Sequence, residues 1–320
     1  MGVFTVREII VGSRKSKLAL IQTNWVIDQL KDKSVAFSFR VKEIETKGDK
    51  NLGVSLAKFA GQGVFLQELE AQLTNGDVDI AVHSLKDMPV TLPEGLTIAC
   101  IPEREDHRDA YIANNDIPFL ELPKGAVIGT SSVRRAAQIL AKRPDIQTKW
   151  IRGPVDSRLD QLRQGDFDAI ILAVAGMKRL GISEGNITEY LPDEHFIPAM
   201  GQGALAIECR EDDQEVKDML QSIHDEDTAK AVTTERLFLD AFHEGEQAPI
   251  GGYAFVQDGE IHLRGMVISL DGQTVLRYEA SGTDPEVIAN HVADDLIERG
   301  ALDIIAQVNQ ELTNDDFTTK

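Results

Sequence analysis

Cysteine is scarce in this sequence, which has only Cys100 and Cys209 among its 320 residues. Two cysteines cannot build a disulfide framework, and their separation does not match the spacing of metal ligands. Such a chain suits a reducing cytoplasm. Long apolar runs are also missing. Residues 1–17 lack the apolar core of a signal peptide, and no stretch is long enough to span a bilayer. We therefore expect a cytoplasmic protein with no membrane partner.

Positive charge is in deficit too, with 33 Lys and Arg against 53 Asp and Glu and a formal net charge of −20. This balance argues against nucleic acid and anionic membranes as partners. Residues 129–158 are the exception, because seven basic residues there outnumber two acidic ones, a local charge of +5. The segment indicates either a recessed site for a small polyanion or a solvated basic helix face. Lys142 and Arg143 are assigned to the solvated face.

The seven histidines are scattered without the spacing of metal ligands, so no metal site is predicted. His83 lies close in sequence to Ser84 and Asp87, which suggests a catalytic triad. Neighbouring residues on a strand point to opposite faces, however, so contact among the three is not expected. A structural role is the better interpretation of His83.

The stretch Asp77–Val90 combines a buried strand with a polar end. Apolar residues alternate along Val78–Val82, which is typical of a strand, and Lys86 and Asp87 follow before Pro89 ends regular structure. Open α/β sheets build ligand sites where strands end in polar residues. The stretch suggests a functional site, although by itself a solvated corner between a strand and a loop is the better interpretation, because polar corners are common.

Two other strands are each followed by the start of a helix that carries arginine. Ser13 or Ser16 caps the first helix, which places Arg14 and Ser16 at an N-terminus that favours anions. Ser131 or Ser132 caps the second, with Arg134 and Arg135 in its first turn. The helix dipole repels cations at this end. An anion that offsets this cost is therefore expected beside the two arginines, and we predict that it is a ligand.

Strands and helices alternate in two successive series, before and after about residue 105, which predicts two doubly wound α/β lobes. Asp258-Gly259 and Asp271-Gly272 then mark hairpins followed by an amphipathic helix, which predicts a small α+β domain. The expected domains are residues 1–103 with 201–222, residues 104–200, and residues 223–320.

Seven sequence strings occur in one order across nearly the whole chain, and together they resemble the porphobilinogen deaminase family. The strings are GSRKSKLAL, AVHSLKDMP, EREDHRDA, GTSSVRRAAQ, DAIILAVAGMKRLG, PAMGQGALAIECR and APIGGYA. The resemblance implies lobes like those of periplasmic binding proteins. It implies a monomeric transferase of haem biosynthesis, a hydroxymethylbilane synthase that condenses four porphobilinogen molecules head to tail with release of ammonia. It also implies a dipyrromethane cofactor that a cysteine holds through a thioether.

The resemblance assigns roles to individual residues. Asp87 corresponds to the catalytic aspartate. The residues implied to bind the carboxylates of substrate or cofactor are Arg14, Ser16, Lys58, Lys86, Ser132, Arg134, Arg135, Arg152 and Arg158. Lys58 and Phe65 correspond to an active-site loop around residues 55–66. Arginine suits this work because its planar guanidinium pairs with a carboxylate through two hydrogen bonds.

The chain departs from the family pattern at several positions near this site. Glu246, in the cofactor loop at 243–252, stands where the family has its attachment cysteine. Gln62 replaces a lysine of the active-site loop, Gln67 replaces another lysine shortly after it, and Pro154 replaces an asparagine. A carboxylate cannot form a thioether, and we expect Cys100 and Cys209 to be buried structural thiols.

Three hypotheses follow. The first is a porphobilinogen deaminase that works with an altered cofactor arrangement, of which non-covalent binding is one form. The second is a family member that binds pyrroles or another small polycarboxylate without turnover. The third is a bilobed anion-binding protein without chemistry. Asp87 and the arginines favour the first two, because a protein that only binds anions has no need of a carboxylate facing its ligand.

Overall fold

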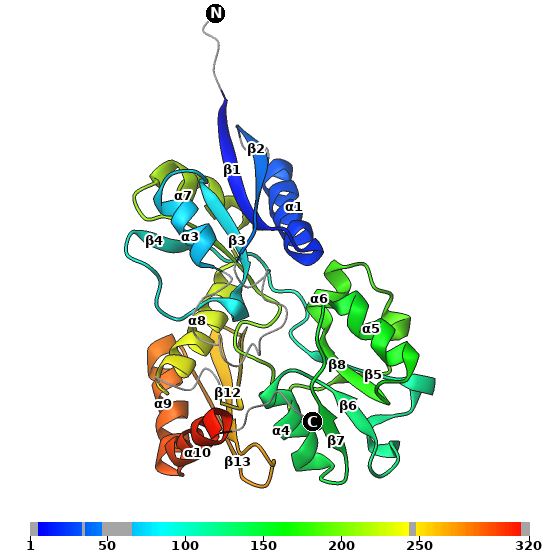
Figure 1. The fold of residues 1–320 in the computed structure, drawn as a ribbon. Coiled ribbons are helices and arrows are strands. Elements are labelled where there is room, and N and C mark those ends of the chain that lie inside the picture. The colour runs from blue at the N-terminus through cyan, green and yellow to red at the C-terminus, as the bar shows by residue number, and fades with distance from the viewer. Residues whose placement is uncertain (1–5, 34–35, 47–65, 243–247, 315–320) are drawn as a thin grey trace, which may run out of the picture. The chain divides into compact units, whose positions relative to one another are not determined.

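The computed structural model describes residues 6–33, 36–46, 66–242 and 248–314. These residues form two compact units, whose elements are labelled in Figure 1. The first unit holds the described residues before 105 together with 204–229. The second holds 105–203 and the residues from 230 onward. The chain therefore leaves the first unit and returns to it.

The first unit is built on a five-stranded sheet with the order β2-β1-β3-β10-β4. Its strands are β1 (Arg7–Arg14), β2 (Phe37–Ile44), β3 (Ile80–Ser84), β4 (Leu96–Cys100) and β10 (Leu205–Arg210). The first three strands of that order are parallel, and β10 is antiparallel to both β3 and β4. Helices α1 (Lys17–Asp32) and α7 (Gln214–Leu220) pack on one face, and α3 (Gln67–Thr74) packs on the other. Helices on both faces explain why the strands are apolar on both faces.

The second unit contains a sheet that repeats this pattern, with the order β7-β6-β8-β5-β9. Its strands are β5 (Asp109–Ala113), β6 (Val127–Gly129), β7 (Gln147–Lys149), β8 (Ala169–Ala173) and β9 (Glu189–Leu191). Here β7, β6 and β8 are parallel, and β5 is antiparallel to its two neighbours. The accompanying helices are α4 (Val133–Lys142), α5 (Val155–Gln164) and α6 (Val174–Arg179).

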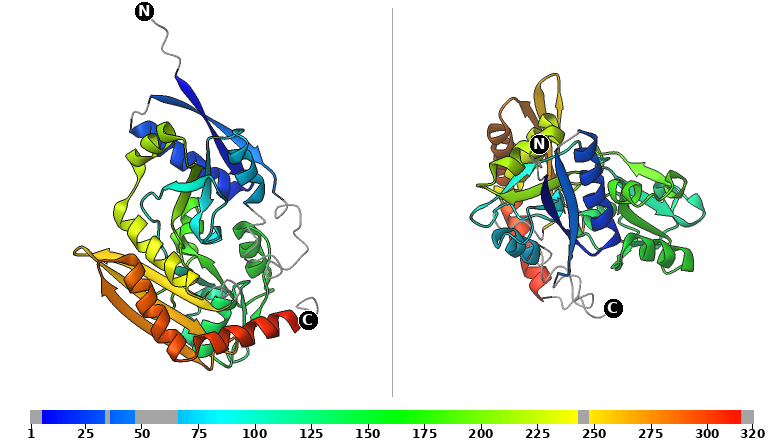
Figure 2. Two further views of the ribbon diagram at one scale, coloured as in Figure 1. Left: turned by 90° about the vertical axis from the view of Figure 1, so that its left-hand side faces the viewer. Right: turned by 90° about the horizontal axis from the view of Figure 1, so that it is seen from above.

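The same unit carries a three-stranded antiparallel sheet near the C-terminus (Figure 2). Its elements are β11 (Ile250–Gln257), β12 (Glu260–Ile268), β13 (Val275–Gly282), α8 (Glu226–Asp240), α9 (Pro285–Glu298) and α10 (Ala301–Asn314). Side chains of the three helices and the sheet share one apolar core. The turn at Asp258 and Gly259 has φ angles of 53° and 82°, the left-handed pair that a two-residue hairpin needs.

The fold class predicted from the sequence is confirmed: two α/β lobes and a small α+β domain. Ser16 and Ser132 cap α1 and α4, which resolves the two pairs of capping candidates. Short 3₁₀ helices connect the elements at Leu85–Asp87, Asn114–Asp116, Phe119–Glu121, Glu184–Asn186 and Gln221–Ile223. Within the described ranges, every helix is too short or too polar to cross a bilayer.

Candidate active site

A single 3₁₀ turn presents Lys86 and Asp87 at the end of β3. Leu85, the first residue of the turn, is 1% exposed, and its backbone N–H donates to the carbonyl of Ala204 over 3.1 Å. The N–H of Met88 closes the turn onto the carbonyl of Leu85. Lys86 and Asp87 are both exposed. The buried leucine therefore fixes the turn, while the two charged side chains remain accessible to a ligand.

Arg14 and Ser16 lie at the same edge of this sheet, because β1 and β3 are parallel neighbours and both end there. The Ser16 hydroxyl accepts from the N–H of Ala19 over 3.2 Å and so caps α1. Gln22 of α1 bonds Ser84, the last residue of β3, over 3.0 Å. The structure thus brings together four residues predicted for the site: Arg14, Ser16, Lys86 and Asp87.

In the second unit, Arg134 and Arg135 are buried, with 5% and 8% of their surface exposed. Arg134 donates to Asp109 Oδ2 over 2.9 Å, and Arg135 donates to Asp109 Oδ1 through Nε and Nη2 over 3.0 and 2.7 Å. Gln202 donates to the same Oδ1. The anion that offsets the two arginines is therefore the protein's own Asp109, in place of the ligand that the sequence predicted.

The charge state of Asp109 follows from this environment. Burial by itself would raise the pKa of Asp109, but the charges of Arg134 and Arg135 outweigh burial and hold the pKa well below its usual range. Asp109 is therefore ionised at neutral pH. It neutralises one of the two guanidinium charges beside it, so the group of three keeps a net positive charge.

Arg152 and Arg158 add to this positive charge. Burial, and then repulsion from Arg135 and Arg152, lower the pKa of Arg158 to about 10. Among the described residues, Arg158 Nε donates a hydrogen bond to the carbonyl of Gly153 over 2.8 Å. The Arg152 guanidinium lies 6.0 Å from the ring centroid of Trp150. Because the Arg158 guanidinium bonds a neutral carbonyl, it keeps a positive charge with which it can bind a carboxylate ligand.

Pro154, where the resemblance implies an asparagine, forms the N-cap of α5. Proline offers no side-chain acceptor, and the cap has no side-chain hydrogen bond. The helix instead begins with Arg158 N–H bonded to the Pro154 carbonyl over 3.1 Å. The substitution keeps α5 in place and removes an amide that could have bonded a ligand.

Three residues of the second unit were missed by sequence reasoning. Asp109 and Gln202 lie far from the arginines in the chain, and their partnership depends on strand pairing. Arg179, at the end of α6, donates to the carbonyl of Gly203 over 2.7 Å, and burial lowers its pKa to about 10. The string AGMKRLG contains Arg179, but this arginine lies beyond the basic segment at residues 129–158.

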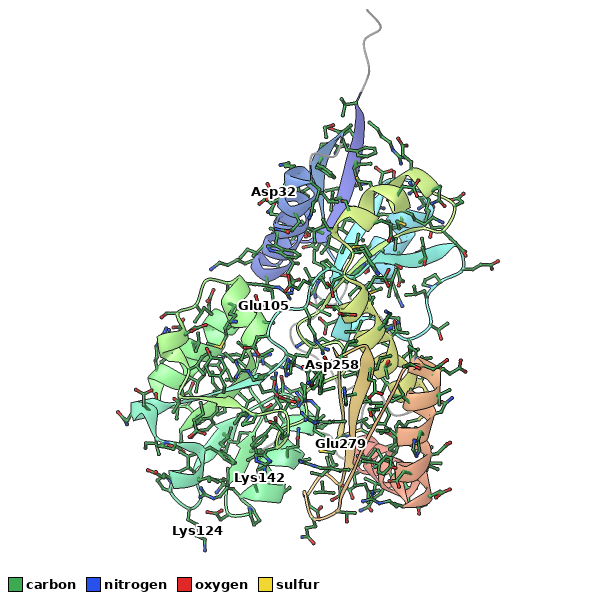
Figure 3. The ribbon with its side chains drawn as sticks, turned by 180° about the vertical axis from the view of Figure 1, so that it is seen from behind. Asp32, Glu105, Lys124, Lys142, Asp258 and Glu279 are labelled. Atoms are coloured by element: carbon green, nitrogen blue, oxygen red, sulfur yellow. The ribbon has the colours of Figure 1, made fainter. Side chains whose placement is uncertain are left out.

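Lys142 lies on the solvated face to which both Lys142 and Arg143 were assigned, whereas Arg143 does not. Lys142 is exposed at the end of α4 (Figure 3). Arg143 is half-buried: it pairs with Asp145 and donates to the carbonyls of Phe119, Leu120 and Leu122. The assignment of Arg143 was therefore wrong, because this arginine binds a loop that is remote in sequence. Two other predicted residues, Lys58 and Glu246, lie outside the described residues, as does the loop around residues 55–65.

Cys100 and Cys209 are buried in β4 and β10, as predicted. Burial raises the pKa of the Cys100 thiol to about 12 and that of Cys209 to about 11. A thiol that is both buried and protonated is a poor nucleophile. Cys100 and Cys209 therefore lack the exposed, readily ionised thiol that attachment of a cofactor calls for.

The geometry defines a class: an α/β protein in which each of two lobes presents cationic side chains at the carboxyl ends of parallel strands, with an accessible aspartate on one of them. Models for "Porphobilinogen deaminase, dipyromethane cofactor binding domain" and "Porphobilinogen deaminase, C-terminal domain" match residues 9–218 and 229–298. The chain belongs to the porphobilinogen deaminase family.

Curated relatives cover almost the full length. A porphobilinogen deaminase of Oceanobacillus iheyensis is 53% identical over 96% of this chain and 99% of its own length. One from a Geobacillus strain is 52% identical over 96% of this chain and 99% of its own length. One from Bacillus pumilus is 50% identical over 97% of this chain and 100% of its own length. Among solved structures, a YaeC-family lipoprotein of Enterococcus faecalis covers 69% of this chain and 92% of its own, with a TM-score of 0.41 and 12% identity.

Replacing Asp109 by asparagine should destabilise the second unit. The variant leaves Arg134 and Arg135 buried without a counter-charge, and breaking a buried ion pair in this way costs about 3–5 kcal/mol. Because the folded pKa of Asp109 is depressed, its stabilisation is present above the unfolded pKa of about 3.9 and is lost as pH falls below it. Urea unfolding of wild type and Asp109→Asn from pH 7 to pH 3 measures both effects.

The matched control is Asp160→Asn, because the ion pair of Asp160 with Arg163 has both side chains more than 60% exposed. It should unfold like wild type. Equal stability of Asp109→Asn and Asp160→Asn at pH 7 would contradict the role given to Asp109.

Proposed function

We propose that the protein is a hydroxymethylbilane synthase, which condenses porphobilinogen head to tail and releases ammonia. The observation that carries this proposal is the turn that holds Lys86 and Asp87 accessible beside Arg14 and Ser16. The family match and the 50–53% identity to curated porphobilinogen deaminases support it. A monomer acting in the cytoplasm on a small polyanionic substrate remains our expectation.

Each group in the first unit has a distinct task under this proposal. Porphobilinogen carries an acetate and a propionate, and Arg14 and Lys86 supply cations for them at the sheet edge. Loss of ammonia leaves positive charge on the pyrrole system. The Asp87 carboxylate can stabilise this charge and accept a proton from the ring, because an ionised acid placed where cationic charge develops lowers the barrier. Asp87 is exposed, so its carboxylate is accessible to the substrate.

In the second unit, Ser132, Arg152 and Arg158 are proposed to hold carboxylates of the growing chain. Arg134 and Arg135 keep their predicted place in this set, with their position fixed by Asp109. Their contribution is the net positive charge of the group. Such a site retains a linear polycarboxylate more tightly as pyrroles are added, because each pyrrole brings two further negative charges.

A dipyrromethane cofactor fits this chain in one respect and not in another. Its carboxylates suit the arginine set, and Arg158 has charge to offer. Covalent attachment through a thiol does not fit, because both cysteines are buried with raised pKa values. We infer that the primer is held by ion pairs, without a thioether. A relative that binds pyrroles without turnover remains the second candidate, and the lack of an accessible thiol is the observation that favours it.

Asp87→Asn should lower the rate of porphobilinogen consumption by about 100- to 1000-fold, the usual effect of removing one electrostatic catalytic group. The fold should persist, since Asp87 is exposed. Steady-state kinetics and circular dichroism measure the two quantities. Glu94→Gln, an exposed carboxylate after the same turn, is the control and should keep wild-type kinetics. Turnover that is unchanged in Asp87→Asn would remove Asp87 from its role.

The intact mass of the denatured protein tests how a primer is held. We expect the mass of the bare chain, 35.2 kDa, before and after incubation with porphobilinogen. The non-denatured sample should release dipyrromethane when high salt weakens the ion pairs. A mass increment of two linked pyrroles that survives denaturation would contradict non-covalent binding, and peptide mapping would then locate the bond.

A further inference from the structure

Three ionisable side chains are buried together behind the turn that carries Asp87. His83 of β3 and Glu208 of β10 have side chains that are 3% and 0% exposed, with 3.0 Å between His83 Nε2 and Glu208 Oε2. Glu70 of α3 is 9% exposed, and it interacts electrostatically with both. The proposed chemistry uses none of the three. Burial of two carboxylates with one imidazole is costly unless protons and hydrogen bonds compensate.

Strand pairing explains why these residues meet. In the antiparallel register of β3 and β10, His83 lies opposite Ala206 and Glu208 lies opposite Ala81. Residues two apart on a strand share a face, so His83 and Glu208 lie on the same face of the sheet. Leu69 and Leu73 of α3 pack with Ala81, which identifies this as the face that α3 covers. The three groups thus join a helix to two central strands.

One atom of the cluster lacks a partner. Among the described residues, Glu208 Oε1 is buried and accepts no hydrogen bond. A buried carboxylate oxygen without a donor is uncommon and calls for an explanation. A proton on Glu70 would give this oxygen no donor, but it would remove a second negative charge from the buried group. In agreement, burial and then the charge of Glu208 raise the pKa of Glu70, with His83 acting in the opposite direction.

The elements around β3 carry other charged groups besides the three of the cluster. The elements that pack against it are α1, α3, β1 and β10. Arg7 of β1 and Arg210 of β10 both pair with Asp79 and Asp213. Gln22 of α1 bonds Ser84, and Arg14 lies at the end of β1. On α3, Glu68 is half-buried two residues before Glu70. Among the described residues on the face that α3 covers, Glu70 and Glu208 interact with His83.

We propose that His83, Glu208 and Glu70 form a positioning cluster for Asp87, in which one retained proton keeps the end of β3 and the turn after it in the reactive geometry. His83 is followed directly by Ser84 and by Leu85, whose N–H bonds Ala204. Ala204 leads directly into β10, the strand that carries Glu208. A change of charge on His83 or Glu208 can therefore shift either partner of the Leu85–Ala204 hydrogen bond, which fixes the turn. The proposal rests on the proposed role of Asp87.

The tests are Glu70→Gln and Glu208→Gln, each of which preserves shape. Glu70→Gln imitates the protonated acid permanently. We expect wild-type kcat to fall on the alkaline side as Glu70 loses its proton, and Glu70→Gln to keep its kcat there.

Glu208→Gln removes the partner of His83. It should lower kcat about tenfold and shift the pH profile while KM changes less than twofold, because the residues that bind substrate carboxylates are untouched. Glu211→Gln, an exposed carboxylate just after β10, is the control and should match wild type.

A second readout does not depend on turnover. A raised folded pKa means that Glu70 contributes stability below its unfolded pKa of about 4.3 and that this stability is lost as pH rises through the folded value. The Tm of Glu70→Gln relative to wild type should therefore increase as pH rises from about 4, below the unfolded pKa, to pH 8. A Tm difference that does not change with pH overturns the retained proton.

The two readouts separate the possible failures. If wild type does not consume porphobilinogen, the proposed function fails, and the Tm measurement still decides whether the cluster holds a proton. If wild type is active, and both variants change Tm but keep the wild-type pH profile of kcat, the cluster is merely structural. That result would overturn the positioning role.

Discussion

The pairing of Asp109 with Arg134 and Arg135 is the interaction on which the anion-binding lobe depends. Two guanidinium groups in the first turn of a helix repel each other and the helix dipole, and burial makes this repulsion stronger. One buried carboxylate, held by four hydrogen bonds from three side chains, allows both arginines to remain charged. It balances one charge of the two. The remainder, with Arg152 and Arg158, is what a polycarboxylate can bind.

The two lobes place their charged side chains in similar ways. Each sheet has four strands that run in one direction and one antiparallel strand inserted between two of them, and in each the functional side chains follow the carboxyl ends of the parallel strands. A buried apolar residue next to the charged ones fixes the chain: Leu85 before Lys86 and Asp87, and Ile151 before Arg152, each 1% exposed. The energy of burying these side chains, about 1.5–3 kcal/mol each, holds the charged neighbours at the surface.

Local sequence signals predicted much of this. Alternating apolar residues located the strands, and the serine caps of α1 and α4 follow from short-range hydrogen bonding. The +5 segment pointed to the lobe that holds the arginines. What could not be predicted depends on pairing between remote residues. Asp109 reaches Arg135 because β5 pairs with β8, and Glu208 reaches His83 because β10 pairs with β3. For the same reason, an anion was correctly expected at Arg134 and Arg135, but its source was not.

The central claim is that this chain performs chemistry on porphobilinogen and does more than bind it. The most direct measurement is the stoichiometry of a wild-type reaction, as ammonia released per porphobilinogen consumed together with the identity of the product. The account predicts one ammonia for each porphobilinogen and a linear tetrapyrrole, hydroxymethylbilane. Binding of porphobilinogen without release of ammonia would contradict it, and the protein would then be a polycarboxylate binder with the fold of an enzyme.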